Sequence, residues 1–298
     1  MRKSLKCAVF AAAAALFAAA SARAAVQIGI PDDATNGARA IKLLETAGLI
    51  TVDPAVGFAP ELKDVTAYLY DVEIVPTQAN TLPATLDDYA ASTINGTYAV
   101  PAGLLPSRDA LLVEKSERGQ ENPFVNVIAA RSAEKDKETF KKIVSAYQTQ
   151  TVAEYILAKY HEAYYPAFDY KQDFTPDSGL VSAVDEYRSS REGKEVVKVG
   201  VCGSSNAQWN AVQKVLDERG DKIYIELVEF DAYNLPNEAL NSGEVDLNAF
   251  QHKAFLKKEA GSQEYQIEAI GDTIIAPLSL YSRKVKTLDE LKTLAGKK

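Results

Sequence analysis

The chain has 298 residues and a formal net charge of −8, because 41 acidic side chains outnumber 33 basic ones. This balance disfavours nucleic acid and anionic membrane surfaces as partners. Two cysteines and two histidines are too few for a disulfide framework, and neither histidine has metal-ligand spacing, so we expect no metal and no other cofactor. The expected partner is a small molecule or another protein.

The first 24 residues have the pattern of a secretory signal peptide. Basic residues come first, an Ala-rich apolar run follows from Cys7 to Ala20, and an Ala-Arg-Ala cleavage site ends at Ala24. The run is too short to span a bilayer, and no later segment approaches the roughly 20 apolar residues that spanning needs. Cys7 stands at the start of the apolar run, whereas a lipid-bearing Cys follows it, so we expect an exported protein without a lipid anchor. Cys202 would be its single cysteine, which excludes an intrachain disulfide.

After the signal, short β-branched runs alternate with helical patterns. Strands are predicted at residues 26–30, 72–75, 92–100, 124–130, 196–201, 223–230, 245–250 and 274–282. Helices are predicted at residues 37–47, 85–92, 135–149, 151–160, 206–218 and 287–298. Thr85 is the expected cap of the second helix, and capping boxes are expected from Thr151 to Glu154 and from Thr287 to Glu290. This alternation indicates an α/β architecture with mostly parallel strand pairing.

Residues 169–195 break the alternation. The segment is polar, charged and poor in strand formers apart from a short "GLVSAV" run. We interpret it as a surface linker with one or two helical turns rather than a functional lid. It separates two blocks of α/β sequence.

No catalytic set is evident in the sequence. A strand-turn-helix nucleophile motif is absent. The turn "GVCGSSNAQ" lacks the Lys of a phosphate-binding loop and the third Gly of a dinucleotide fingerprint. Cys202, at the end of a predicted strand, is expected to be a small buried hydrophobe rather than a nucleophile.

The turn "PDDATNGARA" at residues 31–40 follows the first strand and opens a helix. Free backbone N–H groups around Asn36 would lie at the positive end of that helix, as in many anion sites. Arg39 is disfavoured by the same dipole, so we expect it to bind an external partner, such as a carboxylate held by two hydrogen bonds. The competing interpretation is a solvated Arg39 on the helix surface.

Polar and aromatic residues also gather at other predicted strand ends, namely Asn95, Tyr233, Asn248, Phe250 and His252. Each alone fits an ordinary turn, core or half-buried position. Together they predict a ligand cleft, in which amides meet an ammonium and a carboxylate and aromatic rings meet an apolar side chain.

Several long stretches carry a family resemblance, among them "IGIPDDATNGARAIKLLETAGLI", "LDDYAASTINGTYA", "VEFDAYNLPNEAL" and "DLNAFQHKAFL". They resemble the NlpA/MetQ family of methionine-binding lipoproteins of bacterial ABC importers. The resemblance covers nearly all of residues 26–168 and 196–298, but the two blocks stand in exchanged order relative to the family. We therefore expect a circularly permuted chain in which residues 169–195 join the family's usual ends.

The resemblance implies a periplasmic-binding-protein fold of type II, with two α/β lobes. Lobe A would take residues 25–98 and 284–298, and lobe B residues 99–168 and 196–283. The implied ligand-binding residues are Asn36, Arg39, Asn95, Asn206, Tyr233, Asn248, Phe250 and His252. Arg39 would hold the ligand carboxylate and Asn95 its polar end. Tyr233, Phe250 and His252 would wall the side-chain pocket.

The chain departs from the family at several positions, which are Thr97, Ser205 to Gln208, Ala249, Ile274 and Ala276. Thr97 stands where a second Asn is usual, and Ala249 where an aromatic residue is usual. A pocket discriminates apolar groups by only about 1–3 kcal/mol per methylene, so such differences can exchange one ligand side chain for another.

We therefore expect a secreted, monomeric substrate-binding protein that closes two lobes around a small amino acid, with methionine implied by the family. Delivery to the membrane permease and ATPase of an ABC importer would follow. Two other classes stay open. One is a periplasmic enzyme that uses Cys202 or His252 in the same cleft, and the other is an interaction protein whose pocket has decayed.

Overall fold

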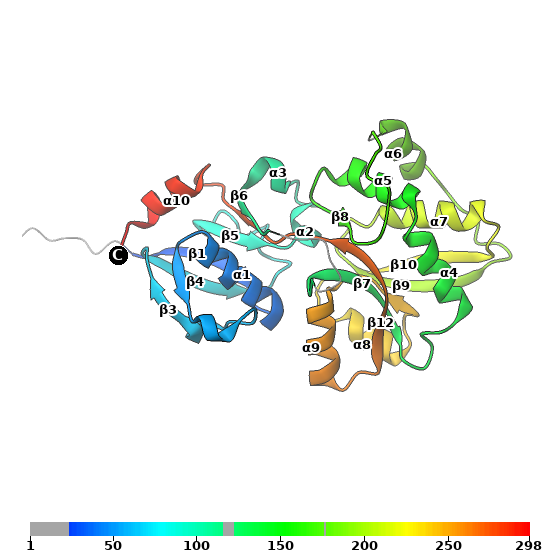
Figure 1. Ribbon diagram of the computed structural model, residues 1–298, viewed down its shortest axis with the longest axis horizontal. Helices are drawn as coiled ribbons and strands as arrows, with labels where there is room; N and C mark the ends of the chain where they lie inside the picture. Colours follow the sequence, from blue (N-terminus) through cyan, green and yellow to red (C-terminus); the bar gives the residue numbers. More distant parts are fainter. Residues whose placement is uncertain (1–23, 116–121, 176) are drawn as a thin grey trace, which may run out of the picture.

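The computed structural model describes residues 24–115, 122–175 and 177–298. Two β-sheets, each packed against helices, form two halves of the molecule that lie side by side (Figure 1). The expectations for residues 1–23, including the signal peptide and the unlipidated Cys7, lie outside the described residues. Among the residues described, no helix combines the length and apolar character needed to cross a membrane.

The first half is built on a five-stranded sheet. Its strands, in spatial order, are β4 (Val72–Thr77), β1 (Val26–Pro31), β5 (Ala91–Ile94), β13 (Ser279–Tyr281) and β6 (Ala110–Val113). Helices α1 (Ala34–Thr46) and α10 (Leu288–Ala295) share a core with it, in which Ile28, Leu44 and Leu291 are fully buried or nearly so. The smaller elements of this half are β2 (Ile50–Val52), η1 (Pro54–Val56), η2 (Leu62–Asp64), β3 (Val65–Tyr68), α2 (Gly96–Ala99) and α3 (Pro106–Asp109).

The second half is built on a six-stranded sheet. Its strands, in spatial order, are β10 (Ile223–Phe230), β9 (Glu195–Cys202), β11 (Leu247–Asn248), β7 (Val125–Arg131), β12 (Ile267–Ile275) and β8 (Tyr165–Pro166). The helices are α4 (Glu138–Tyr147), α5 (Gln150–Tyr160), α6 (Ser178–Asp185), α7 (Gln208–Glu218), α8 (Pro236–Ser242) and α9 (Lys253–Gln263). Trp209 of α7 and Tyr147 of α4 anchor its largest core, with ring centroids 5.2 Å apart.

The α/β architecture is confirmed, but the expectation of mostly parallel pairing is wrong. Parallel pairs join β4, β1 and β5, and they join β10, β9 and β11. The remaining pairs in these two sheets are antiparallel. Strands β7 and β13 enter their sheets directly from the other half, without a crossover helix, so they are free to run against their neighbours.

Local predictions fail where burial overrides helix propensity. Residues 85–92 form turns and the start of β5, not a helix, because Leu86 is fully buried and the Ala90 N–H donates to the Gln27 carbonyl oxygen in the sheet. Residues 92–100 are only partly strand, since α2 begins at Gly96. No capping box forms at Thr151, because α5 already begins at Gln150.

The segment 169–195 packs on the surface of the second half. Its helix α6 contacts α5 and α7, and the Asp185 carboxylate accepts hydrogen bonds from Tyr155 and Lys159 of α5. Further along, Tyr187, Ser189 and Lys194 all donate to Asp217 of α7. The expected linker therefore contains one short helix and is attached to the second half at two points, Asp185 with α5 and residues 187–194 with Asp217.

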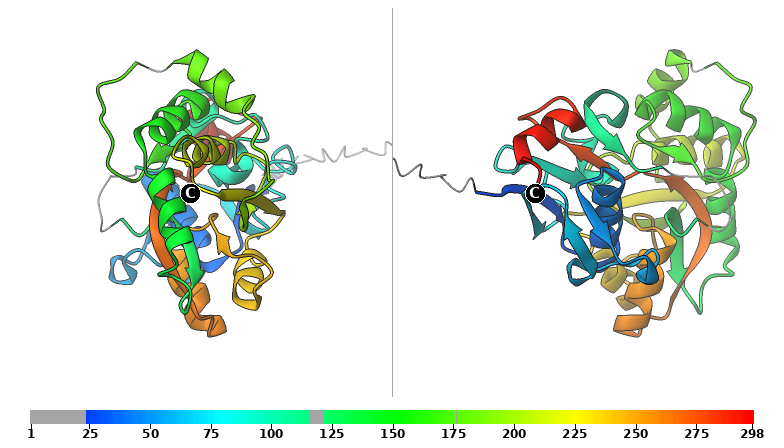
Figure 2. Two further views of the ribbon diagram at one scale, coloured as in Figure 1. Left: turned by 90° about the vertical axis from the view of Figure 1, so that its right-hand side faces the viewer. Right: turned by 60° about the vertical axis from the view of Figure 1, so that its left-hand side comes forward.

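Both ends of the described chain meet at Asp71 in the first half. The Val26 N–H donates to the Asp71 carbonyl oxygen, and the Asp71 N–H donates to the Gly296 carbonyl oxygen, each at 2.9 Å. Figure 1 and the right-hand view of Figure 2 show the C-terminus beside the start of β1. The capping box from Thr287 to Glu290 that opens α10 is confirmed.

The first sheet includes strands from both expected lobes. β6 and β13 belong to this sheet, although they fall in the ranges assigned to lobe B, because β13 pairs with both β5 and β6. The division into two lobes with boundaries at residues 98 and 284 stays a prediction.

Candidate functional site

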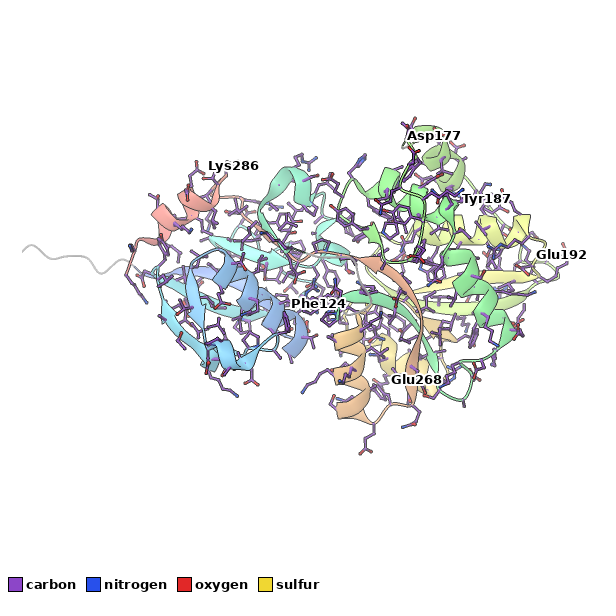
Figure 3. The ribbon with its side chains drawn as sticks, viewed as in Figure 1. Phe124, Asp177, Tyr187, Glu192, Glu268 and Lys286 are labelled. Atoms are coloured by element: carbon purple, nitrogen blue, oxygen red, sulfur yellow. The ribbon has the colours of Figure 1, made fainter. Side chains whose placement is uncertain are left out.

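A cavity lies where the two halves meet. It is lined by Asn36, Arg39, Asn95, Gly96, Thr97, Asn126, Tyr233, Phe250, Gln251, His252, Phe255 and Ala276. The first half contributes α1, Asn95 and the start of α2, and the second contributes β7 and the segments around α8 and α9. Phe124, which precedes β7, marks this junction in Figure 3.

The helix start at "PDDATNG" is fixed by a local cap. Asp33 is the N-cap of α1, and its carboxylate accepts from both the backbone N–H and the side-chain amide of Asn36. This orients the Asn36 carboxamide so that its Oδ1 faces inward, where it accepts from Arg39, Asn95 and His252. Asn36 is therefore the hub of the polar wall of the cavity.

Arg39 is 4% exposed, so the surface interpretation of this residue is wrong. Its Nε and Nη2 donate to the two Glu114 carboxylate oxygens at 3.1 and 2.5 Å, and Nη2 also donates to the Ala276 carbonyl oxygen. One Nη1 hydrogen goes to Asn36. A guanidinium carries five N–H groups, so the hydrogen bonds among the described residues leave one for a ligand. Arg39 thus forms with Glu114 the pair of hydrogen bonds that we expected it to form with a ligand carboxylate.

His252 contributes a neutral ring to the polar wall. Its Nδ1 accepts from the Phe255 backbone N–H and so caps α9, which places the proton on Nε2, 3.4 Å from the Asn36 Oδ1. Burial and the nearby Arg39 charge hold the pKa of His252 well below its usual range. Arg39, the charged residue of the cavity lining, is paired with Glu114.

Asn95 has an unpaired acceptor in the cavity wall. Its Nδ2 donates to Asn36 at 2.9 Å, but its buried Oδ1 has no hydrogen-bond partner in the described part of the chain. A buried unsatisfied acceptor typically costs about 1–3 kcal/mol. The Asn95 Oδ1 is therefore suited to a ligand N–H group.

Three aromatic rings form the opposite wall. Tyr233, Phe250 and Phe255 contact one another with ring centroids 5.9 to 6.0 Å apart. Tyr233 also stacks at 4.9 Å on Tyr98 of the first half. These rings offer an apolar surface to a ligand side chain.

Contacts across the cavity hold the halves together in this structure. The Tyr98 hydroxyl donates to the Asp231 carbonyl oxygen at 3.1 Å, in addition to the contact between Asn36 and His252. The cavity volume is about 20 Å³, little more than the ~10–15 Å³ that one water molecule requires. The space between the walls is thus small in this structure.

Six of the eight predicted site residues line this one cavity, and two do not. Asn206 lies in an adjoining cavity, where its Nδ2 donates to the Cys202 and Gly203 carbonyl oxygens. Asn248 is fully buried in an amide network with Asn237 and Gln251, outside the cavity lining. Asn248 does lie at a strand end, as predicted, but its side-chain amide forms hydrogen bonds with other residues of the protein.

Sequence reasoning missed four lining residues, Gly96, Asn126, Gln251 and Phe255, and the two residues that contact Arg39 beside the cavity, Glu114 and Phe124. The Phe124 ring lies 4.6 Å from the Arg39 guanidinium carbon, and Phe255 belongs to the aromatic wall. Phe255 follows "FQHKA" and was recognisable as an aromatic residue one helical turn beyond His252. Glu114 is 75 residues from Arg39, and no sequence pattern links the two.

The groups that an enzyme would use here are not activated. Cys202 is buried, and burial with the nearby Asp231 raises the pKa of its thiol far above the usual value. His252 has both ring nitrogens engaged within the protein. In the described residues no cluster of His, Cys, Asp or Glu could hold a metal ion.

A sequence model of the NlpA lipoprotein family matches residues 19–168 and 197–296. The unmatched residues between these ranges coincide closely with the linker segment. The chain belongs to the NlpA lipoprotein family.

Individual relatives match part of the chain. The D-methionine-binding lipoprotein MetQ of Yersinia pestis is 41% identical over 128 residues, which are 42% of this chain and 46% of that protein. A periplasmic substrate-binding protein of an ABC transporter from Coxiella burnetii is 38% identical over 32% of this chain and 40% of its own, with a TM-score of 0.30. A nutrient-binding protein from Burkholderia cenocepacia, solved with methionine, is 31% identical over 47% and 57% of the two chains, with a TM-score of 0.42. The chain spans about half the length of the curated relatives it matches.

Proposed function

We propose that this protein is the periplasmic substrate-binding component of an ABC importer and that it captures a small zwitterionic amino acid, with methionine as the reference ligand. The observation that carries the proposal concerns the described residues: one Arg39 N–H that their hydrogen bonds leave over and the unpaired Asn95 Oδ1 border a single cavity. A ligand carboxylate would accept from Arg39, and the ligand ammonium would donate to Asn95.

The charge balance of the site supports a ligand without net charge. Arg39 is already paired with Glu114 and His252 is neutral, so a ligand with a net charge would meet no unpaired opposite charge in the cavity lining. A zwitterion brings both signs and meets a donor and an acceptor. The names of the relatives, which include methionine-binding and ABC-transporter substrate-binding proteins, support the same class.

Capture would proceed by closure of the two halves. The contacts of Tyr98 with Asp231 and of Asn36 with His252 would break in the open form and re-form around the ligand. Exclusion of water then strengthens the polar contacts with the ligand. The closed, monomeric protein would deliver the ligand to a membrane permease and ATPase.

We also propose that the chain is circularly permuted, with one lobe on each sheet. The adjacency of Val26 and Gly296 at Asp71 supports this, because a chain whose family order is exchanged needs its present ends to be neighbours. We further propose that the mature protein is periplasmic and carries no lipid. Recovery of the processed protein in the membrane fraction would contradict the last proposal.

The test is a thermal-shift panel of amino acids on the purified mature protein and on Asn95→Ala. Ligand at about 100 times its dissociation constant stabilises the folded state by about 2.7 kcal/mol, a clear shift in midpoint. Asn95→Ala removes the ligand acceptor and leaves the Arg39–Glu114 ion pair intact. Asn210→Ala, a partly exposed position on α7, is the matched control. The proposal requires a shift in the parent and the control that is lost in Asn95→Ala, and it fails if no amino acid shifts the parent.

A further inference from the structure

A second cavity adjoins the first and belongs to no role assigned so far. The two cavities share four lining residues, Thr97, Asn126, Phe250 and Ala276, so only side chains separate them. The second has a volume of about 30 Å³, enough for about two water molecules at ~10–15 Å³ each. It extends into the second half, towards the start of α7.

The second cavity is polar but uncharged. Its walls include the buried polar residues Asn206, Gln208 and Thr273 together with two buried tyrosines, and no lining residue in the described chain carries a charge. Gln208 is fixed by the Tyr160 hydroxyl, which donates to its Oε1 at 2.6 Å. Asn206 and Gln208 are held by hydrogen bonds within the protein, so Asn126 is the lining amide that can form hydrogen bonds with a guest.

Asn126 connects the two cavities. It lines both, and within the described chain its carboxamide makes no hydrogen bond to another residue. The Phe250 ring also borders both, so an unbranched side chain can pass along it from the aromatic wall into the second cavity. An amino acid anchored at Arg39 and Asn95 would then present the end of its side chain to Asn126 and the polar walls beyond.

We propose that the second cavity is a subsite for the end of the ligand's side chain, and that the ligand is an amino acid whose unbranched side chain ends in an uncharged hydrogen-bonding group. A carboxamide or a sulfoxide has this chemistry, whereas a thioether or an alkyl end leaves the Asn126 carboxamide without a partner. The inference rests on the proposed function, because the first cavity must hold the amino and carboxylate groups.

The experiment compares ligands of equal length on the mature protein by calorimetry and thermal shift. The panel is glutamine, methionine sulfoxide, methionine, norleucine and glutamate. We expect glutamine or methionine sulfoxide to bind at least tenfold more tightly than norleucine, because a buried polar site rejects analogues that leave it unpaired. Glutamate should bind more weakly than glutamine, since the subsite offers no compensating charge.

Two variants assign the effect to the second cavity. Ala249→Leu fills space in a cavity that only the longer side chains reach, so it should abolish the preference for glutamine or the sulfoxide while serine or alanine still binds. Thr273→Val keeps the volume, removes one hydroxyl and should reduce the same preference if Ala249→Leu does not fold.

Three results would overturn the inference. Methionine or norleucine binding as tightly as the polar-ended ligands would do so while leaving the proposed function intact. Tighter binding of dipeptides than of free amino acids would assign the subsite to a backbone extension instead. Absence of any shift with all amino acids would remove the proposed function and the subsite together.

Discussion

The two walls of the first cavity are held in place by different forces. On the polar wall, Asn36 accepts three hydrogen bonds and Arg39 makes four, so every side chain is oriented by directional contacts. On the aromatic wall, Phe250 and Phe255 are held by ring packing, which is not directional. The polar wall can therefore fix the orientation of a ligand. Single substitutions in the aromatic wall, in contrast, can change which ligand side chain the cavity accepts.

The largest expected effect comes from breaking the charge balance of the polar wall. Arg39→Met leaves Glu114 partly buried without its partner and should destabilise the protein by about 3–5 kcal/mol. The double variant Arg39→Met with Glu114→Leu removes both charges and should recover much of that loss. Urea denaturation of the single and double variants measures the coupling. A loss below about 1 kcal/mol in Arg39→Met would show that the ion pair does not organise this wall.

The aromatic wall should respond differently. Phe255→Ala is expected to cost about 3 kcal/mol, at the low end for a buried Phe, because one side of the ring already borders a cavity. Ligand binding should weaken for long side chains and change little for alanine or serine, which depend on the polar wall. The free energy of unfolding and the ligand panel test both points. An equal loss of affinity for short and long side chains would contradict the division between the walls.

The polar wall also predicts a pH effect that the aromatic wall lacks. His252 has a lowered pKa in the folded protein, so below about pH 6.5 the unfolded chain binds a proton that the folded protein does not. Stability is therefore lost as pH falls below 6.5, by up to about 1.4 kcal/mol per pH unit until the folded group titrates.

His252→Asn isolates this contribution. Asn is a good helix cap and does not titrate, so it can replace the His252 cap of α9. The difference in unfolding free energy between parent and variant, followed from pH 7.5 to 5.0, should shrink as the pH falls. Carboxylates common to both proteins cancel in the difference. A difference that stays constant with pH would mean that the His252 ring is protonated in the folded protein, or that it does not contribute to the pH dependence of stability.

The sequence predicted what is encoded locally and missed what is made by distant pairing. The capping box at Thr287, the break between α4 and α5, and the buried strands follow from nearest neighbours. Arg39 was recognised as a residue in need of a partner, but the partner inside the protein, Glu114, comes from a crossing segment that no pattern connects to α1. Asn248 looked equivalent to Asn95 because both end strands, yet only tertiary packing decides which amide meets the cavity.

The smallest effect is expected from moving the chain ends, which tests the two halves rather than the two walls. Gly296 and Val26 both bond to Asp71, so a linker of about 2–6 residues can join Lys298 to Val26. New ends between Glu192 and Gly193 would lie at a tip far from the site (Figure 3), in a turn where Gly193 has positive φ and no close neighbour. Lys194 would keep its bond to Asp217, and α6 would stay packed on α5 and α7.

The rearranged chain, residues 193–298 followed by 26–192, should match the parent in unfolding free energy within about 1 kcal/mol, since only one exposed turn is opened and one short loop closed. Its ligand affinity should be unchanged. A chain opened inside the buried helix α7, between residues 212 and 213, is the control and should not fold. Failure of the first rearrangement would mean that residues 169–195 contribute to folding beyond joining two ends, and the proposed permutation would lose its physical basis. Equal stability of the parent and the rearranged chain would show that the fold does not depend on where the chain ends lie. The polar and aromatic walls would then depend on the packing of the two sheets and not on the order of the segments along the chain.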